Sequence, residues 1–460
     1  MSPLAGRDGA STALLLDLYE LTMAQSYWAE GMTERLATFS LTCRGLPRGW
    51  GFLLAAGLDD ALALLERLRF TEADLAHLAS LGRFRDDFLA WLGTLRFTGD
   101  VRALPEGTPC FPDEPLLEVT GPLVEAQLAE TALMNVLHVH TLLASKAARS
   151  VAAARGRPLA EFGLRRTHGP DAGLAAARAA YLAGFASTSD VLAGARFGIP
   201  VSGTMAHSYV ESFPDELTAF RAYARAFPDA AILLVDTYDT VAGARNAAIV
   251  GRELAAAGHA LVGVRLDSGD LGSLAHEVRR VLDEAGLRDT TIVASGGLDE
   301  RSIAGLIDGG APIDAFGVGT RVVVSADAPA LDIAYKLVAL DGRATVKLAP
   351  GKVTLPGAKQ VWRVELDGVA VRDVLGLADE PGPPGGRPLL EPVLVAGRRT
   401  GEGGLAAARA RAARERAILP DAVRALDAAP YPVERSGALE RLLERAVGEA
   451  RGHAGPGFAG

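Results

Sequence analysis

The spacing of hydrophobic and polar positions divides the chain into three regions. In the first, apolar side chains recur three and four positions apart over residues 57–68 and 73–91, which is typical of amphipathic helices. Short alternating runs within residues 35–125, and the turn-rich stretch 97–120, indicate strands in the same region. We therefore expect a small α+β domain over residues 13–125.

The first residues of the chain lack such a pattern, and we expect residues 1–12 to be disordered. Threonine is a residue type that accepts hydrogen bonds from the first turn of a helix. The apolar spacing after Thr12 is that of a buried helical face from Leu14 to Ala24. We expect Thr12 to cap this helix.

The second region, residues 126–335, begins within a long helix expected over 122–154 and then alternates short apolar strands with helices. Sustained β–α alternation predicts a parallel sheet. One half of an open sheet requires fewer than the roughly seven β–α units found here. We therefore expect an irregular β/α barrel. The expected strands are 159–163, 184–187, 200–204, 231–236, 261–267, 291–295 and 315–319, and the expected helices are 172–182, 240–257, 271–286 and 299–309.

The third region, residues 336–452, continues a β-rich stretch that starts near residue 334 and ends near 376. A Pro- and Gly-rich loop over 379–387 and two helices, over 404–417 and 436–451, follow. We expect this region to pack on the N-terminal domain and the tail 453–460 to fray.

Composition excludes several classes of protein. The net charge of −9 gives the whole chain no attractive field for nucleic acid or an anionic membrane. No run of 18 apolar residues predicts a membrane span, and no apolar signal segment follows Met1. Cys43 and Cys110 have neither CxxC nor zinc spacing. We expect free thiols and a cytoplasmic enzyme.

The expected strand ends carry the candidate chemistry, because active sites of β/α barrels form at the carboxyl ends of their strands. Ser295, Gly296 and Gly297 follow the sixth strand, and Gly319 and Thr320 follow the seventh. Glycines let backbone N–H groups approach phosphate oxygens, and helix N-termini favour anions. Turn glycines without a ligand are the alternative, but two glycine-rich ends at adjacent strands favour a phosphate site.

The fifth strand ends in an arginine and two aspartates. Alternation along the strand puts Arg265 and Asp267 on one face, where a guanidinium can hold a flat anionic ring and a carboxylate can accept ribose hydroxyls. An internal salt bridge is the alternative. For Asp270 we favour a helix-capping role.

Among eight histidines, His207 has the strongest case for chemistry. It follows the third expected strand, and Asp236 ends the next one. An aspartate on one imidazole nitrogen fixes the tautomer and makes the other nitrogen more nucleophilic. A lone histidine is more often structural, but this pairing predicts a phosphate-accepting residue.

Arg165 and Arg166 follow the first strand of the barrel. If that strand continues, the two side chains point in opposite directions. We expect Arg165 to face the ligand and Arg166 to form a salt bridge.

Together these motifs resemble the nicotinate phosphoribosyltransferase family over nearly the whole chain. The motifs that carry the resemblance lie at 17–24 (DLYELTMA), 162–166 (FGLRR), 169–171 (GPD), 203–208 (GTMAHS), 264–271 (VRLDSGDL) and 317–320 (GVGT). The resemblance implies a type II phosphoribosyltransferase-like barrel. It implies that nicotinate and phosphoribosyl pyrophosphate give nicotinate mononucleotide and pyrophosphate in NAD salvage, coupled to ATP hydrolysis, with Mg²⁺ and a homodimer.

The resemblance also implies a role for each matched residue. Tyr19, Thr204 and Arg265 would hold nicotinate, with Tyr19 reaching the site of the partner subunit. His207 would be phosphorylated by ATP and oriented by Asp236. The phosphoribosyl group would be bound by Asp267 at its hydroxyls and by Gly296, Gly297, Gly319 and Thr320 at its 5-phosphate.

Asp190 is a departure from the pattern, because a neutral side chain is expected there in relatives that bind nicotinate. A carboxylate near the ring would repel the ring carboxylate and favour nicotinamide, whereas Asp190 as a helix cap would not. We favour the cap. The alternative functions are a nicotinamide-specific enzyme, a quinolinate enzyme, and a non-catalytic barrel that binds a phosphosugar.

Overall fold

The computed structural model describes residues 11–348, 354–401 and 403–453. Nearly all of the expected disordered start (1–12) and of the expected frayed tail (453–460) lies outside the described residues. The chain forms two compact units. Both terminal segments (residues 1–145 and 330–460) make the first, here called the terminal unit, and residues 146–329 make the second, the barrel unit. These units divide the chain differently from the expected domain bounds, which stay predictions.

The barrel unit contains a parallel six-stranded sheet in the order β7-β6-β11-β10-β9-β8. An isolated parallel bridge from Thr188 to Val201 adds a seventh position beside β7. Among the described residues no pairing joins Val201 to β8, so the sheet curls without closing. The strands are β6 (Leu159–Glu161), β7 (Ser187–Thr188), β8 (Ile232–Leu234), β9 (Gly263–Leu266), β10 (Thr291–Ala294) and β11 (Ala315–Val318).

This arrangement confirms the expected irregular β/α barrel. The strand expected over 200–204 is reduced to the bridge at Val201. Pro200 has no N–H to donate and Gly203 weakens extended structure, which accounts for the loss of regular pairing there.

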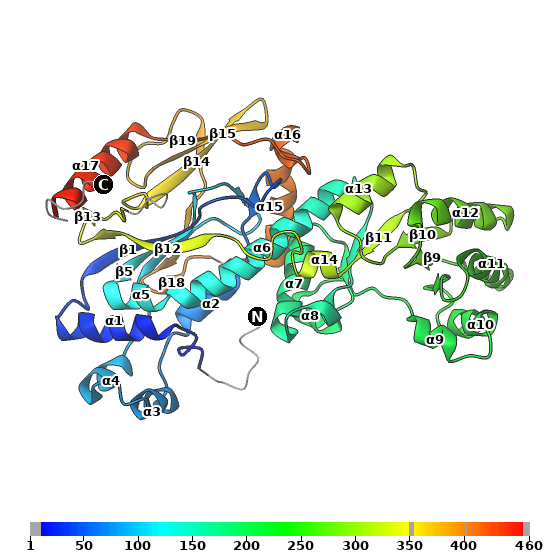
Figure 1. Cartoon of the computed structure of the whole chain (residues 1–460), viewed down its shortest axis with the longest axis horizontal. Helices are drawn as coiled ribbons and strands as arrows, with labels where there is room; N and C mark the ends of the chain where they lie inside the picture. Colours follow the sequence, from blue (N-terminus) through cyan, green and yellow to red (C-terminus); the bar gives the residue numbers. More distant parts are fainter. Residues whose placement is uncertain (1–10, 349–353, 402, 454–460) are drawn as a thin grey trace. The chain divides into compact units, whose positions relative to one another are not determined.

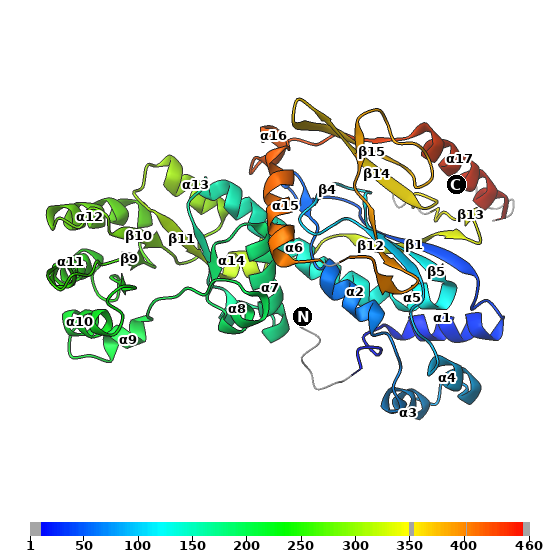
Figure 2. The ribbon, with the colours of Figure 1, turned by 180° about the vertical axis from the view of Figure 1, so that it is seen from behind.

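Helices follow the strands of the barrel unit, and several begin at an aspartate whose carboxylate accepts a backbone N–H of the first turn. Figures 1 and 2 show α10, α11 and α12 packed side by side. The helices are α7 (Pro170–Ala183), α8 (Val191–Phe197), α9 (His207–Glu211), α10 (Glu216–Ala226), α11 (Thr240–Ala256), α12 (Leu271–Glu284), α13 (Glu300–Asp308) and α14 (Thr320–Val323), with a 3₁₀ turn, η2, at Leu164–Arg166.

The terminal unit is built on a seven-stranded sheet of order β13-β12-β1-β5-β3-β17-β18. Its strands are β1 (Leu36–Cys43), β3 (Asp100–Ala103), β5 (Pro115–Pro122), β12 (Ile333–Leu340), β13 (Arg343–Ala344), β17 (Glu391–Val395) and β18 (Arg398–Arg399). The antiparallel pairing of β17 with β3 ties the C-terminal segment to the N-terminal one, which confirms that both form a single α+β domain.

Two smaller sheets and the remaining helices complete the terminal unit (Figure 1). The sheets comprise β2 (Leu53–Leu54), β4 (Pro109–Cys110), β14 (Lys359–Leu366), β15 (Val369–Leu377), β16 (Gly386–Pro388) and β19 (Val433–Arg435). The helices are α1 (Leu18–Ala29), α2 (Leu58–Glu66), α3 (Glu72–Ser80), α4 (Asp86–Leu92), α5 (Leu123–Leu128), α15 (Leu405–Ala417), α16 (Asp421–Arg424) and α17 (Gly437–His453), and α6 (Glu130–Ala154) continues past Ser145.

Further local expectations were wrong. The helix expected over 122–154 is two helices, α5 and α6, separated at Ala129. The first helix begins at Leu18 and not at Leu14, because Asp17 and Glu20 form a capping box that Thr12 cannot offer. The helix expected over 73–91 is two helices, α3 and α4, separated at Gly82, whose φ of +61° ends α3. The loop expected over 379–387 contains the start of β16.

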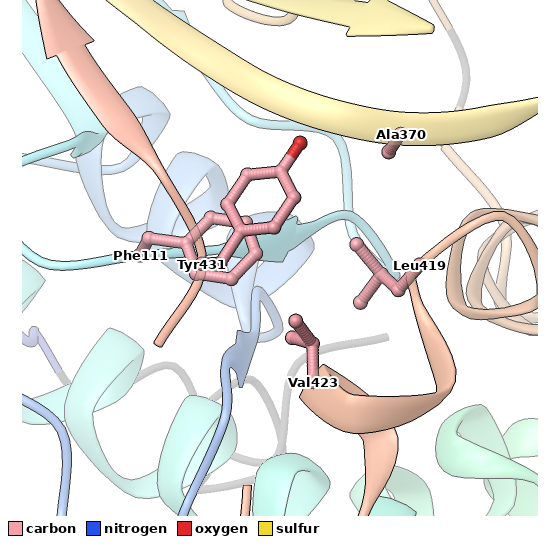
Figure 3. Packing of buried hydrophobic residues seen from close by; sticks show 5 residues of the cluster. All are labelled: Phe111, Ala370, Leu419, Val423 and Tyr431. Atoms are coloured by element: carbon pink, nitrogen blue, oxygen red, sulfur yellow. The ribbon is translucent and has the colours of Figure 1, made fainter. Parts of the chain in front are cut away.

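A hydrophobic cluster holds the N- and C-terminal segments together (Figure 3). Phe111 stacks on Tyr431 with ring centroids 4.0 Å apart, and Ala370, Leu419 and Val423 pack around them. Burial of this apolar surface favours the joined segments over either one alone.

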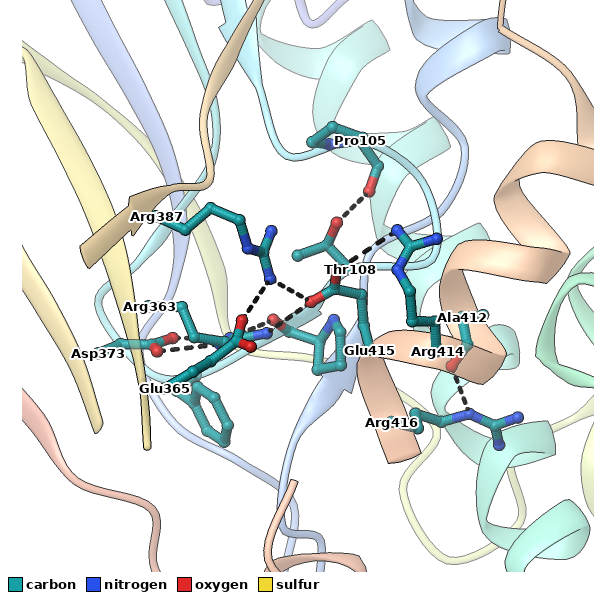
Figure 4. Close-up of polar contacts among 12 residues, drawn as sticks. Pro105, Thr108, Arg363, Glu365, Asp373, Arg387, Ala412, Arg414, Glu415 and Arg416 are labelled. Atoms are coloured by element: carbon teal, nitrogen blue, oxygen red, sulfur yellow. Dashed lines mark hydrogen bonds and ion pairs between the residues drawn. The ribbon is translucent and has the colours of Figure 1, made fainter. Parts of the chain in front are cut away.

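A buried ion-pair network lies beside this cluster (Figure 4). Arg363 donates from Nε and Nη2 to the two carboxylate oxygens of Asp373, at 3.0 and 2.7 Å, and from Nη2 to the carbonyl of Pro109. Tyr431 donates its hydroxyl to Asp373 at 3.0 Å. Burial, and then the charge of Asp373, raise the pKa of Glu114 well above its ordinary value.

Candidate active site

A cavity of about 560 Å³ opens at the carboxyl ends of the strands in the barrel unit. It is lined by ten residues predicted as site residues, namely Arg165, Thr204, His207, Arg265, Asp267, Ser295, Gly296, Gly297, Gly319 and Thr320. The structure therefore brings together residues from five strand ends that are far apart in sequence. Their roles stay predictions.

The Gly296–Gly297 turn has a backbone that other residues rarely adopt, with φ of +91° and +68°. A Cβ at Gly296 would lie 1.8 Å from the carbonyl oxygen of Asp267, so no side chain fits there. No atom lies within 4 Å of a Cβ placed at Gly297. The turn thus presents backbone at the cavity wall, where an anion can meet N–H groups.

Phe162 is a cavity residue that was named only as part of the FGLRR motif, without a predicted role. A Cβ at Gly317 would lie 2.6 Å from its ring, and one at Gly319 would lie 3.0 Å from its carbonyl oxygen. These two glycines are therefore required by the close approach of Phe162 as much as by a ligand. The signal was in the sequence, because an aromatic residue at a barrel strand end faces either the core or the ligand.

Arg265 reaches across the cavity floor. Its Nη1 donates to the hydroxyl of Thr204 at 2.7 Å, and its Nη2 lies 3.6 Å from Asp267 Oδ1. Within the described part of the chain its buried Nε has no hydrogen-bond partner. Burial lowers the pKa of this guanidinium from its ordinary value. Arg265 therefore forms a loose internal salt bridge with Asp267, which was one of the two alternatives. Its Nε stays available as a donor to a ligand, which was the other.

Asp267 is held in place from two sides. Its Oδ1 accepts a short hydrogen bond from Ser295 Oγ, and its backbone N–H donates to Asp236 Oδ2 at 3.0 Å. Asp236 Oδ2 also accepts from Ser268 Oγ at 2.6 Å. Its second oxygen, Oδ1, is buried and lacks a partner among the residues described. Asp236 thus supports the loop that carries the Asp267 carboxylate.

His207, the first residue of α9, has its Nδ1 3.2 Å from the hydroxyl of Thr237. The direct bond expected from Asp236 to this imidazole is not formed in the structure. Asp236 bonds instead to Asp267 and Ser268, and Thr237, the next residue of the loop after β8, takes the place beside the ring. The orienting role of Asp236 stays a prediction.

The two arginines after β6 do not point in opposite directions. The strand ends at Glu161, and residues 164–166 form the 3₁₀ turn η2. As a result both Arg165 and Arg166 line the cavity. The salt bridge expected for Arg166 is not found among the described residues, because the premise of a continuing strand was wrong.

Asp190 is a helix cap, as expected. It is 3% exposed, and its Oδ1 accepts from the backbone N–H of Ala193 at 3.0 Å at the start of α8. The neighbouring residue, Ser189, lines the cavity. Asp270 likewise caps α12, accepting from Ser273.

Tyr19 lies on α1 of the terminal unit and is 45% exposed. Its predicted contact with a partner subunit stays a prediction. Cys43 and Cys110 are buried free thiols. Residues 11–348, 354–401 and 403–453 include no group of three or more His, Cys, Asp or Glu side chains arranged for a metal. They also include no helix long and apolar enough to cross a membrane.

A glycine-walled cavity with arginines and one aspartate, at the strand ends of a β/α barrel, defines an enzyme that binds a small phosphorylated substrate. The model of the nicotinate phosphoribosyltransferase N-terminal domain matches residues 14–138, and that of the nicotinate phosphoribosyltransferase family matches residues 158–352. The chain belongs to the nicotinate phosphoribosyltransferase family.

Individual relatives agree with this assignment. A nicotinate phosphoribosyltransferase of Mycobacterium tuberculosis is 49% identical over 456 residues, which cover 97% of each chain. The human enzyme is 40% identical over 83% of this chain and 82% of its own length. The crystal structure of human nicotinic acid phosphoribosyltransferase superposes with a TM-score of 0.84 and 36% identity, covering 94% of this chain and 100% of the human one.

Proposed function

We propose that this protein joins nicotinate to phosphoribosyl pyrophosphate, forming nicotinate mononucleotide and pyrophosphate in NAD salvage. The observation that carries the proposal is the cavity that combines Arg265, whose Nε has no partner in the described part of the chain, with Asp267 and the Gly296–Gly297 turn. Family membership and the activity named for the relatives support it.

Each part of the substrates has a chemical counterpart in the cavity. The guanidinium of Arg265 would take the ring carboxylate, because its planar fork matches that anion. Asp267 would accept the two ribose hydroxyls. The backbone at Gly296, Gly297 and Gly319, with Thr320 at the start of α14, would bind the 5-phosphate.

The charges in the cavity favour the acid over the amide as substrate. Three arginines line it (Arg165, Arg166 and Arg265), and Asp267 is the single carboxylate among the described lining residues. Asp190 does not line the cavity, so its charge gives no reason to prefer nicotinamide. This excess of positive charge stabilises a ring carboxylate and the departing pyrophosphate.

In the bond-forming step the ring nitrogen supplies its lone pair to the anomeric carbon. The bond from that carbon to pyrophosphate breaks, and the pyrophosphate leaves with the electron pair. The ribose passes through an oxocarbenium-like state, so the arginines act by neutralising the leaving group. Asp267, bound to the ribose hydroxyls, holds the sugar in register with the ring.

We also propose that ATP phosphorylates His207. The bond from the γ-phosphorus to its bridging oxygen breaks, a nitrogen–phosphorus bond forms, and ADP leaves with the electron pair. Water later cleaves the phosphohistidine to release phosphate. The added charge beside the cavity would change substrate affinity, which is how ATP hydrolysis would be coupled to the reaction.

Mg²⁺ fits these residues in one way. With no cluster of three acidic side chains among the described residues, the ion would be held mainly by substrate phosphates and by one or two carboxylates, which is its usual mode at phosphate sites. Asp267 and Asp236, whose Oδ1 is unpartnered among the described residues, are the carboxylates that fit. When bound, the ion would neutralise charge on the leaving pyrophosphate.

The same proposal includes a cytoplasmic homodimer with its active site at the subunit interface. Tyr19 would extend from one subunit to the nicotinate ring in the other. Its exposed ring on α1 supports this arrangement.

The test is a parallel assay of the purified protein with phosphoribosyl pyrophosphate, Mg²⁺ and ATP, offering nicotinate or nicotinamide. We expect mononucleotide and ADP from nicotinate. Product from nicotinamide alone would assign the amide as substrate. Stabilisation by phosphoribosyl pyrophosphate without turnover of either ring would indicate a non-catalytic binding protein.

The phosphohistidine is tested by His207→Ala. We expect the variant to fold but to lose ATP hydrolysis and incorporation of label from γ-labelled ATP. His259→Ala is the matched control, because His259 pairs with Asp229 at the surface of the same unit. Unchanged ATP hydrolysis in His207→Ala would remove His207 from this step.

A further inference from the structure

A buried carboxylate lies at the strand end that leads into η2, the turn that carries Arg165 and Arg166. Glu161 is the last residue of β6, is 1% exposed and does not line the cavity. Its Oε1 accepts a short hydrogen bond from the backbone N–H of Gly163, and its Oε2 accepts from Thr188 Oγ1 at 2.6 Å. Each carboxylate oxygen thus binds one donor, and the side chain joins the ends of β6 and β7.

Gly163 lies in a narrow space between this carboxylate and α14. A Cβ at Gly163 would lie 2.3 Å from Val323 Cγ1 and 2.9 Å from Glu161 Oε1, so only glycine fits there. The carbonyl of Gly163 accepts the backbone N–H of Arg166 at 2.7 Å, which closes the turn η2. The bond from Gly163 to Glu161 therefore fixes the point at which η2 begins.

The two arginines of η2 have little other support. Arg165 and Arg166 are exposed and line the cavity, and no salt bridge to another described residue holds either side chain. Their position before a ligand binds therefore depends on the backbone of the turn. A cation that is already in place at an anion site loses less conformational freedom when the anion arrives.

We propose that Glu161 is a positioning residue for Arg165 and Arg166, which it holds at the cavity by binding the backbone N–H of Gly163. The proposal rests on the proposed function, in which the arginines neutralise the leaving pyrophosphate. Groups that bind a ligand need supporting hydrogen bonds that keep them within a fraction of an ångström of the productive position. Glu161 supplies such a bond to η2, and its second bond, to Thr188, ties the turn to the neighbouring strand.

Glu161→Met gives the first test, because methionine is similar in size and removes both acceptor oxygens. A displacement of about 1 Å in a group that positions the substrate can lower a rate about 100-fold. We expect kcat/KM for phosphoribosyl pyrophosphate to fall by about 10-fold to 100-fold. The affinity for inorganic pyrophosphate, measured by titration calorimetry, should fall as well. Wild-type values of both quantities in Glu161→Met overturn the proposal.

Two conservative variants test the acceptor itself. In Glu161→Gln the amide oxygen can still accept from Gly163, and the NH₂ group can donate to the Thr188 oxygen, so most of the activity and of the pyrophosphate affinity should return. Glu161→Asp keeps the charge but draws the acceptor oxygens back by one methylene, and it replaces Glu161→Met if that variant does not fold. Activity as low in Glu161→Gln as in Glu161→Met would mean that the hydrogen bond to Gly163 is not the cause.

The double variant Arg165→Ala/Arg166→Ala separates positioning from a general loss of stability. In that background Glu161→Met should lower kcat/KM no further, because the side chains that Glu161 positions are gone. A general loss of stability would instead add its full effect. Additive losses therefore overturn the positioning role.

Asp314→Ala is the matched control, since Asp314 Oδ2 accepts the backbone N–H of Ile292 at 2.8 Å at the opposite edge of the same sheet. It should leave kcat/KM and pyrophosphate affinity unchanged.

The double variant Arg165→Ala/Arg166→Ala also distinguishes the two levels of the argument. If it behaves as the wild type, or if the wild type itself binds no pyrophosphate, the role of the arginines in the proposed function fails. A lowered kcat/KM in the double variant with a normal one in Glu161→Met overturns the positioning role alone.

Discussion

Each unit places an arginine beside an aspartate, and the two pairs differ in almost every other respect. In the terminal unit Arg363 and Asp373 are fully buried, with two bonds at 3.0 and 2.7 Å and further bonds to Pro109 and Tyr431. In the barrel unit Arg265 and Asp267 are 3.6 Å apart, with side chains 13% and 32% exposed. Nε of Arg265 is left without a partner among the described residues.

The difference separates stability from function. Buried charges are tolerated when most of their bonding capacity is used, and Arg363 meets that condition through Nε and Nη2, while its Nη1 has no hydrogen-bond partner among the described residues and lies 3.6 Å from Glu415 Oε2. The Arg265 pair is looser and lies at a cavity, and we predict that its unused bonding capacity binds the ligand. Unsatisfied polar groups gathered at one cavity are the physical mark of a ligand site.

The largest effect is expected from breaking the fully buried pair, Arg363 and Asp373. Arg363→Ala would leave Asp373 and neighbouring carboxylates buried without their guanidinium, which costs about 3–5 kcal/mol of unfolding free energy. Urea denaturation measures the loss. Arg280→Ala, which removes an exposed helical pair with Glu284, should cost about 0.5 kcal/mol or less. Equal losses in both variants would contradict the comparison.

Removing Arg265 should have the opposite effect, a large loss of activity with little loss of stability. We expect Arg265→Ala to lower kcat/KM for nicotinate by about 100-fold, as for other lost charge-stabilising donors, with little change in stability. Arg265→Lys keeps the charge but not the planar fork, and should recover only part of the activity. Steady-state kinetics measures the loss of activity, and thermal unfolding measures the change in stability. Unaltered KM and kcat in Arg265→Ala would remove Arg265 from the site.

Glu20 is a third case, a buried carboxyl that pairs with no arginine among the described residues. Thr131 has one hydroxyl hydrogen and faces both Asp17 and Glu20, so all three are satisfied only when Glu20 is protonated. Burial raises the pKa of Glu20 from 4.5 to about 7. Between these values the folded state holds a proton that the unfolded state has lost.

The free energy of unfolding should therefore fall as pH rises from 4.5 to 7, by at most about 3 kcal/mol, and then level off. Unfolding of wild type and Glu20→Gln, measured across this range, tests the prediction. In the glutamine variant, the part of the pH dependence of unfolding free energy that is due to Glu20 should be absent. Identical pH profiles in the two proteins would show that Glu20 titrates normally.

The smallest effect concerns Asp190, a satisfied carboxylate beside the cavity. Asp190→Ala should cost about 1 kcal/mol as a lost helix cap, and Asp190→Asn less, because asparagine also caps. Neither should change the ratio of kcat/KM values for nicotinate and nicotinamide. A shift of that ratio toward nicotinate in both variants would place the Asp190 charge in the site after all.

Much of the barrel unit was predictable, because each strand is an apolar run followed by polar or glycine residues, and parallel strand ends meet at one edge. That reasoning brought Arg265, Asp267 and Gly296 to one cavity. It failed where a single residue decides the geometry. Asp236 and Thr237 are both polar and adjacent, and only the conformation of the loop after β8 determines which one faces His207.

Other features depend on contacts that no local pattern encodes. Thr12 and Asp17 are both good capping residues, and Glu20 three residues after Asp17 decides between them. The bond from Thr131 to Asp17 joins helices far apart in sequence, so it emerges only from the fold.

The most direct test of the account is a crystal structure with nicotinate mononucleotide bound. We expect the product in the barrel cavity, with its ring carboxylate on Arg265, including the Nε that lacks a partner among the described residues, and its ribose hydroxyls on Asp267. The phosphate should lie against the Gly296–Gly297 backbone. Product bound elsewhere, or bound with Nε of Arg265 still unpartnered, would contradict the claim that this pair is left unsatisfied for the ligand.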